Sequence, residues 1–315
     1  MLAASARFGT IGVLVLLVIV FSVASPDIFP TGQNILNILN QSATLSIVAA
    51  GLTFPLVAGQ FDLSFAAVIS LTGILTVGFL KRSGYPWPLA ALLALSAAAL
   101  IGLIIGLLVS YVRVNAIVAT LGMSTVLLGV NYEYSNGTPI TLDPGPFTKI
   151  ARGQVLGIPA PIIITAVVLV ALWLLLNFTL LGKHTQAVGA NVVAARLAGV
   201  RVAKVTIIAF VICSLCAGLA GVVLAARIGS GQVTAGDGYL LSAFAAVFLG
   251  ASVLRDGEFH ILGTFVGVLI VTVTFNGLSI LGSDSSMQFL FQGGILVAAT
   301  ALSSTARRVL SGALK

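Results

Sequence analysis

The sequence contains very few charged residues. Asp, Glu, Lys and Arg together make up 7% of its 315 residues, whereas 59% are hydrophobic, and the mean hydropathy is +1.17. A soluble domain usually has about 25% charged residues, so this chain cannot cover a surface that faces water. Its long apolar runs do not alternate with polar residues as in a β-barrel. The composition therefore predicts an all-α polytopic membrane protein.

Residues that usually form a catalytic or metal site are also scarce. The two histidines, His184 and His260, lie far apart, and none of the patterns HExxH, GxSxG or GxxxxGK[ST] occurs. Cys213 and Cys216 form a CxxC pair inside an apolar run, where thiols usually act as small buried hydrophobic groups. Asp62 is the one acid expected within the membrane. We therefore expect no enzyme activity, no metal and no cofactor bound by this chain.

Apolar segments long enough to cross a bilayer recur along the whole chain. Crossing takes about 20 residues, and fewer where a helix is broken or sheltered by protein. The second segment contains Pro55 and ends in GQFDLS, directly before the third. We expect that pair to be kinked or partly re-entrant. The predicted spans are 8–24, 43–59, 63–80, 88–111, 115–132, 161–181, 205–226, 239–254, 261–280 and 288–304.

Basic residues predict the orientation of these spans. If the N-terminus is cytoplasmic, ten Lys and Arg residues lie inside and five outside, which favours both termini inside. The net charge of +7 then reflects topology, and no nucleic-acid partner is expected. The stretch 133–160 becomes a periplasmic loop. Residues 1–25 also resemble a secretory signal, but their apolar core is long for one, so we expect an uncleaved first span.

A weak internal similarity suggests two related halves. DLSFAAVISLTG at 62–73 and LLSAFAAVFLGAS at 240–252 share an LS, an AAV and a later glycine. Five predicted spans separate them, as in a 5+5 inverted repeat, which would place a transport path between the halves near the midplane. Convergent packing chemistry explains the same similarity, because small residues let helices approach closely.

One basic segment interrupts the apolar chain at 188–205, VGANVVAARLAGVRVAKV. It contains Arg196, Arg201 and Lys204, with Lys183 and His184 just upstream. The charge rule places it in the cytoplasm. Two roles are compatible with this pattern: the cations anchor the segment beside anionic lipid, or its apolar residues enter a groove on a partner protein.

Five stretches carry a family resemblance: GQFDLSFAAV near the front, NAIVATLGM at 115–123, GANVVAARLAGVRVAKV, LAGVVLAARIGSGQVTAGDGYLLSAFAAVFLGAS, and ILGTFVGVLIVTVTFNGL at 261–278. They resemble the ribose/xylose/arabinose-type permeases of ABC transporters, and more distantly the branched-chain amino-acid and nucleoside permeases. The likeness covers most of the chain in the expected order.

This resemblance implies one permease domain over 1–315 in the bacterial inner membrane. The implied partners are a second permease subunit, identical or paralogous, a periplasmic sugar-binding protein, and a cytoplasmic ATPase that binds ATP and Mg²⁺. The segment 183–204 would be the coupling loop that docks on the ATPase, with Val192, Val193, Ala195 and Leu197 entering its groove. The implied coupling residues are Gly189, Asn191, Ala195, Arg196, Leu197, Gly199, Arg201 and Lys204.

The solute of such a permease would be a monosaccharide or a related polyol. Sugars need hydroxyl and amide partners, so we expect contacts from polar residues facing the interior. Other small polar solutes, such as an autoinducer-type sugar, a nucleoside or a branched-chain amino acid, remain alternatives, as does a secondary carrier that works without an ATPase. The candidate contact residues are Asp62, Asn115, Thr120, Thr125, Asn131, Tyr239 and Asn276.

Overall fold

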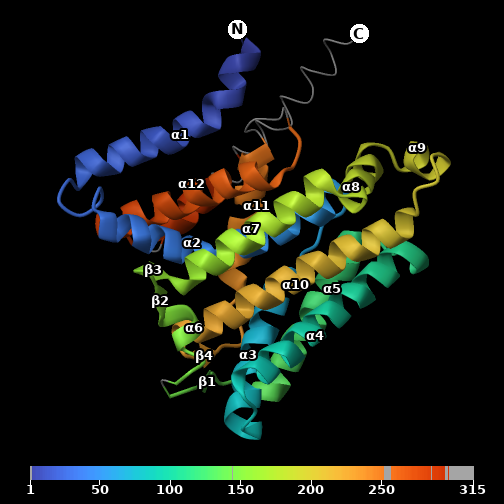
Figure 1. The fold of residues 1–315 in the computed structure, drawn as a ribbon, viewed down its shortest axis with the longest axis horizontal. Helices are drawn as coiled ribbons and strands as arrows, with labels where there is room; N and C mark the ends of the chain where they lie inside the picture. The colour runs from blue at the N-terminus through green and yellow to red at the C-terminus, as the bar shows by residue number, and fades with distance from the viewer. Residues whose placement is uncertain (1, 144, 252–256, 285, 295–296, 298–315) are drawn as a thin grey trace.

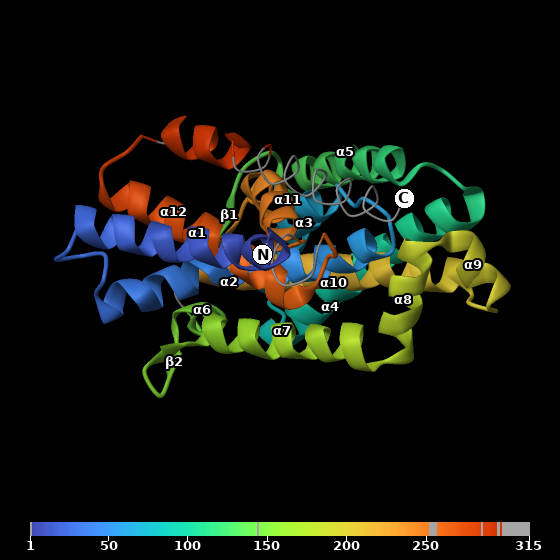
Figure 2. The ribbon, with the colours of Figure 1, turned by 90° about the horizontal axis from the view of Figure 1, so that it is seen from above.

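The protein is a bundle of long helices that lie side by side (Figures 1 and 2). The computed structural model describes residues 2–143, 145–251, 257–284, 286–294 and 297. Within them, seven helical stretches are long and apolar enough to cross a membrane. They are α2 (Gly32–Val57), α3 (Phe65–Ser83), α4 (Trp87–Leu107) with the π-helix η1 (Leu108–Val112), α5 (Ala116–Ser135), α7 (Ala160–Phe178), α10 (Val202–Ile228) and α12 (Ile261–Ile280).

Two further apolar helices are shorter. They are the apolar part of α1 (Leu2–Ala24) and α11 (Asp237–Ala251). Of the predicted tenth span, 288–304, residues 288–294 and 297 are helical, and the others lie outside the described residues. The expectation of an all-α polytopic membrane protein is confirmed.

Helix α2 extends ahead of the predicted span 43–59. It begins at Gly32, because Thr31 caps it by accepting a hydrogen bond from the Asn34 amide at 3.2 Å. The Asn34 side chain donates to Asn276 Oδ1 of α12 and to Phe29 O, both at 3.0 Å. Asn34, a polar residue ahead of the predicted span, is therefore paired inside the bundle.

Helix α10 is the centre of the bundle and packs against α2, α3 and α4. The GxxxG pair of α4, Gly102 and Gly106, allows a close approach to α10. A β-carbon at Gly102 would lie 2.7 Å from Phe210 O, and one at Gly106 would lie 2.7 Å from Ile207 Cα. Small residues thus let α4 and α10 touch backbone to backbone, as the sequence pattern allowed.

The two ends of the bundle carry different connections (Figures 1 and 2). One end holds most of the stretch 133–160, where β1 (Ile140–Thr141) pairs antiparallel with β4 (Ser230–Gly231). Next to α6 (Lys149–Arg152), β2 (Gln154–Val155) and β3 (Ile158–Pro159) form a hairpin. The other end holds α8 (Leu180–Ala190) and α9 (Val192–Leu197), which contain most of the basic segment.

Candidate functional site

The basic segment folds into two short helices joined at Asn191. This residue ends α8 and begins α9, and its Oδ1 accepts hydrogen bonds from the amides of Val193 and Ala194, each at 3.0 Å. Helix α9 ends at Leu197, and Gly199, the residue after its C-cap Ala198, has a φ of +82°. The Gly199 amide donates to Arg196 O and the Val200 amide to Ala195 O, both at 3.0 Å. This is a Schellman motif, which needs a left-handed residue and so favours glycine.

The two faces of α9 differ in polarity and exposure. Ala195 is only 5% exposed and packs with Val188 of α8 and Val205 of α10. It therefore faces inward, and the prediction that Ala195 enters a partner's groove together with Val193 and Leu197 is wrong. Val193 and Leu197 are 66% and 85% exposed. Four cations in or next to the segment are also exposed: Lys183, Arg196, Arg201 and Lys204.

Helix α8 contacts the end of α2 through bare backbone. A β-carbon at Gly189 would overlap the carbonyl oxygen of Val57, the last residue of α2. Beyond Val57 the chain leaves the helix and stays irregular from 58 to 64 before α3 begins. We call 58–64 the first break. The basic segment is thus seated directly on the helix end that leads into this break.

Asp62 lies in the first break and is completely buried. Its Oδ1 accepts hydrogen bonds from the Ser64 amide at 2.8 Å and from the Ser64 hydroxyl at 2.6 Å. Its Oδ2 has no hydrogen-bond partner among the described residues, and Cys213 of α10 lies beside the carboxyl group. Asp62 therefore stabilises the turn into α3 and keeps one acceptor unused.

A second interruption between helices, 229–236, contains β4 and precedes α11, and we call it the second break. The Gly236 amide donates to Ser70 Oγ of α3 at 2.9 Å, and Asn131 Nδ2 of α5 donates to Val233 O at 3.4 Å. The rings of Phe61 and Phe244 stack with centroids 6.2 Å apart. The starts of α3 and α11 are thereby brought together inside the bundle.

The other polar residues singled out in the sequence do not gather at these breaks. Asn115 is exposed and caps α5, so the expectation that it faces the interior is wrong. Thr125 is also exposed and donates to Leu121 O. Thr120 is buried but bonds to Ala116 O of its own helix. Asn276 is paired with Asn34 at the far end of α12.

Tyr239 lies half-buried near the start of α11. Its hydroxyl accepts a hydrogen bond from Arg227 Nη2 at 3.4 Å, and Arg227 Nη1 donates to Asn40 O of α2. Of the candidates, Asp62, Asn131 and Tyr239 therefore lie in or next to the two breaks.

Two serines that contact the breaks were not predicted from the sequence. They are Ser70, which accepts from the Gly236 amide, and Ser124, whose Oγ donates to Leu63 O at 3.0 Å. A lone serine in an apolar helix carries no pattern that marks it.

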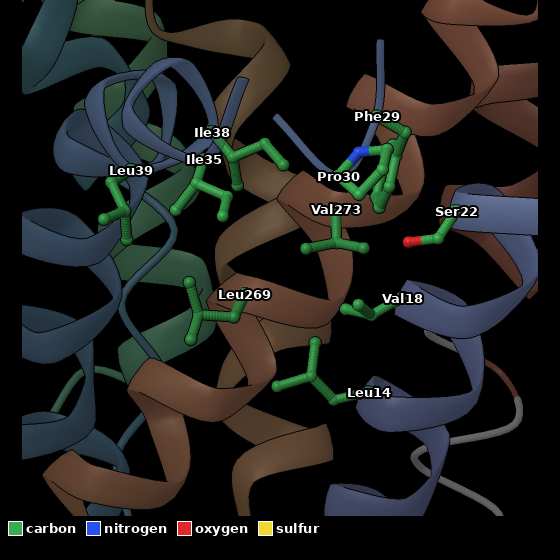
Figure 3. Close-up of a pocket in the computed structure, with 10 residues that line it drawn as sticks. All are labelled: Leu14, Val18, Ser22, Phe29, Pro30, Ile35, Ile38, Leu39, Leu269 and Val273. Carbon is green, nitrogen blue, oxygen red and sulfur yellow. The ribbon is translucent and has the colours of Figure 1, made fainter. Parts of the chain in front are cut away.

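An apolar pocket lies between α1, the start of α2 and α12, away from the breaks (Figure 3). Its volume is about 360 Å³, and Ser22 is its one hydroxyl-bearing residue. A sugar needs several hydrogen-bond partners, so this pocket does not suit one. Within the described residues there is also no group of three or more His, Cys, Asp or Glu side chains that could hold a metal.

Comparison with known proteins identifies the family. The profile of the family described as "Branched-chain amino acid transport system / permease component" matches residues 34–300. The chain belongs to this permease family. No solved structure matches the permease.

Three relatives of the permease, all from Escherichia coli K12, are named for the transport of a sugar. The ribose import permease protein RbsC is 38% identical over 291 residues, 91% of this chain and 90% of the relative. The D-allose transport system permease protein AlsC is 30% identical, covering 94% and 91%. The L-arabinose transport system permease protein AraH is 33% identical, covering 91% and 88%.

Proposed function

We propose that this permease is the membrane subunit of an ABC importer that carries a monosaccharide across the bacterial inner membrane. The observation that carries the proposal is its similarity, over about nine-tenths of its length, to permeases named for ribose, allose and arabinose. All three named solutes are small neutral polyhydroxy compounds. The described residues contain no group of three or more His, Cys, Asp or Glu side chains that could hold a metal, and this suits such a solute, because no charge has to be neutralised.

ATP hydrolysis belongs, in this proposal, to a separate cytoplasmic ATPase that docks on α8 and α9. The exposed Val193 and Leu197 would enter its groove, and Arg196, Arg201 and Lys204 would meet the polar rim. A second permease subunit and a periplasmic binding protein complete the importer. This arrangement places both termini and the basic segment in the cytoplasm, in agreement with the distribution of Lys and Arg.

The contact of Gly189 with Val57 suggests how docking would reach the solute path. Because bare backbone touches backbone there, a displacement of α8 pushes directly on the end of α2. The next residues are the first break with Asp62, which contacts α11 through Phe61 and Phe244. We infer that ATP-driven movement of α8 and α9 is converted at the two breaks into alternating access.

We also propose about ten spans arranged as a 5+5 inverted repeat. Such a repeat pairs α2 with α10, α3 with α11, and α4 with α12. The observed packing is consistent with these pairs: α2 packs on α11 and α12, as α10 packs on α3 and α4. Both α3 and α11 follow a break, and each break contacts the helix that follows the other one. Solute binding between the halves would then involve Asp62, Asn131 and Tyr239.

Transport in proteoliposomes tests this function. The permease is reconstituted with its ATPase and binding protein, and ATP-dependent uptake of labelled ribose, allose and arabinose is measured, with leucine as the competitor that the family description suggests. Uptake of a sugar that leucine does not inhibit is the expected result. Uptake of leucine alone would contradict the proposed solute. Sugar uptake by the permease without ATPase or ATP would identify a secondary carrier instead.

Replacement of 189–200 by a Gly/Ser linker tests the coupling role. We expect sugar-stimulated ATP hydrolysis to be lost while the thermal unfolding of the membrane domain stays close to that of the wild type. If the linker variant couples normally, the docking assignment is wrong.

A further inference from the structure

The β2–β3 hairpin has an unfavourable residue in its turn. Gln154 pairs with Pro159 and Val155 with Ile158, which leaves Leu156 and Gly157 as a two-residue turn. Both have positive φ, +54° and +80°. Turns of this kind strongly prefer Asn, Asp or Gly at the first position, and a bulky side chain there is strained. The conformation of the turn therefore does not explain why Leu156 is present.

The hairpin tip, residues 155–158, also exposes its apolar side chains. Leu156 is 97% exposed, Val155 55% and Ile158 41%. No described part of the chain covers Leu156. Three apolar side chains around one glycine at an exposed tip would be unfavourable in water. Strain and exposure at the same residue indicate that the tip contacts something outside this chain.

The position of the tip identifies the medium that it meets. Helix α7 begins at Ala160, directly after β3, and has strongly exposed apolar residues such as Val167, Val170 and Phe178. A spanning helix with such a surface faces lipid, so the hairpin lies at the edge of the hydrocarbon layer. Figure 2 shows that the hairpin projects from the bundle beside the end of α7.

We propose that the hairpin tip is a lipid anchor, which inserts Leu156 into the boundary between headgroups and acyl chains at the end of the bundle opposite α8 and α9. Lys149, exposed on the neighbouring α6, supplies a charge that complements lipid phosphate. Apolar side chains with a flanking cation are the usual combination at this depth. The anchor fixes the level of α7, whose other end leads into α8. This role is independent of which solute is carried.

Site-specific fluorescence tests the anchor in the full-length permease. The native Cys213 and Cys216 are buried, so Leu156→Cys can be labelled selectively with an environment-sensitive maleimide dye. Asp143→Cys, an exposed polar site at the same end, is the matched control. Single copies are placed in nanodiscs of phosphatidylethanolamine and phosphatidylglycerol. Quenching by a lipid spin-labelled near its headgroup is compared with quenching by aqueous iodide.

We expect the dye at position 156 to be quenched by the spin-labelled lipid about threefold more strongly than the dye at position 143, with the reverse order for iodide. Equal iodide quenching at the two positions would overturn the proposal. Protection of position 156 that appears only with two copies per disc, or only after a binding protein is added, would also overturn it, because the occupant would then be protein.

A second variant removes the anchor and retains the turn. The dye is placed at Gln154→Cys, and Leu156 is either kept or changed to Asn, which the turn favours. Loss of Leu156 should reduce lipid quenching at position 154 by about half or more, whereas the thermal midpoint in detergent should not fall. Unchanged lipid quenching in Leu156→Asn would contradict the role of Leu156.

Discussion

Single residues determine where the helices of the basic segment start and stop. Asn191 supplies one side-chain oxygen to two amides, and Gly199 takes a left-handed conformation that most residues avoid. These effects are local, so each can be altered without disturbing the bundle.

Gly199→Ala should destabilise the end of α9 by about 1–2 kcal/mol, because an alanine β-carbon is strained at positive φ. Gly199→Asn should cost less, since Asn tolerates this region better. We therefore expect sugar-stimulated ATP hydrolysis to fall in the order wild type, Asn, Ala. Equal activity of the Ala and Asn variants would show that the conformation of Gly199 does not matter for coupling.

Asp62→Ala removes both hydrogen bonds to Ser64 and should lower the stability of the permease by about 1–3 kcal/mol. Asp62→Asn keeps an acceptor for the Ser64 amide and should be closer to the wild type in thermal unfolding. Transport then separates two roles. If Asn restores folding and uptake, Asp62 is structural; if it restores folding but not uptake, the unused carboxylate oxygen serves the solute path.

At the scale of elements, several helices of this protein contact each other directly through backbone atoms, at positions occupied by glycine. Gly102 and Gly106 bring α4 against α10, and Gly189 brings α8 against α2. Contacts of this kind leave no flexible side chain between the elements, so a shift of one is passed to the other. The contact between α8 and α2 is the one that joins the basic segment to the membrane domain.

Gly189→Ala should therefore separate α8 from α2. Overlap of the new methyl group with Val57 O costs about 1–3 kcal/mol unless the helices move apart. We expect the variant to bind its ATPase but to lose most sugar-stimulated hydrolysis. Gly122→Ala is the matched control, because a β-carbon at this exposed α5 position meets nothing within 4 Å. Wild-type coupling in Gly189→Ala would refute this route.

At the scale of the whole molecule, the ends of the bundle are distinct, and each break contacts the helix that follows the other break. The basic segment lies at one end and the paired strands β1 and β4 at the other, with α3 and α11 starting inside. A chain arranged in this way can expose a central path to either side by moving one half against the other.

Reporter fusions test the orientation of this arrangement. A phosphatase that is active only in the periplasm, fused after residue 190, should be inactive, whereas the same enzyme fused after residue 137 should be active. The reason is the surplus of Lys and Arg in the loops on the side of the basic segment. High activity after residue 190 would invert the topology and place the proposed docking surface on the wrong side for an ATPase.

The sequence by itself determined the class of protein and most of its helices. Apolar runs in a chain with 7% charged residues can be buried only in a bilayer, and this follows from composition alone. The basic segment and the family resemblance were visible for the same reason, since both are contiguous in the chain. The sequence did not indicate that α2 extends back to Gly32, where Asn34 is paired with Asn276, a partner 242 residues away.

Only the tertiary structure decided which polar residues can act together. It placed Asn115 on the surface as a helix cap and turned Ala195 inward. It also brought Gly236 of the second break against Ser70 of α3. These facts depend on contacts between segments far apart in the chain. The pattern of polar and apolar residues within one helix indicates on which side of that helix a residue lies. It does not indicate which other helix covers that side.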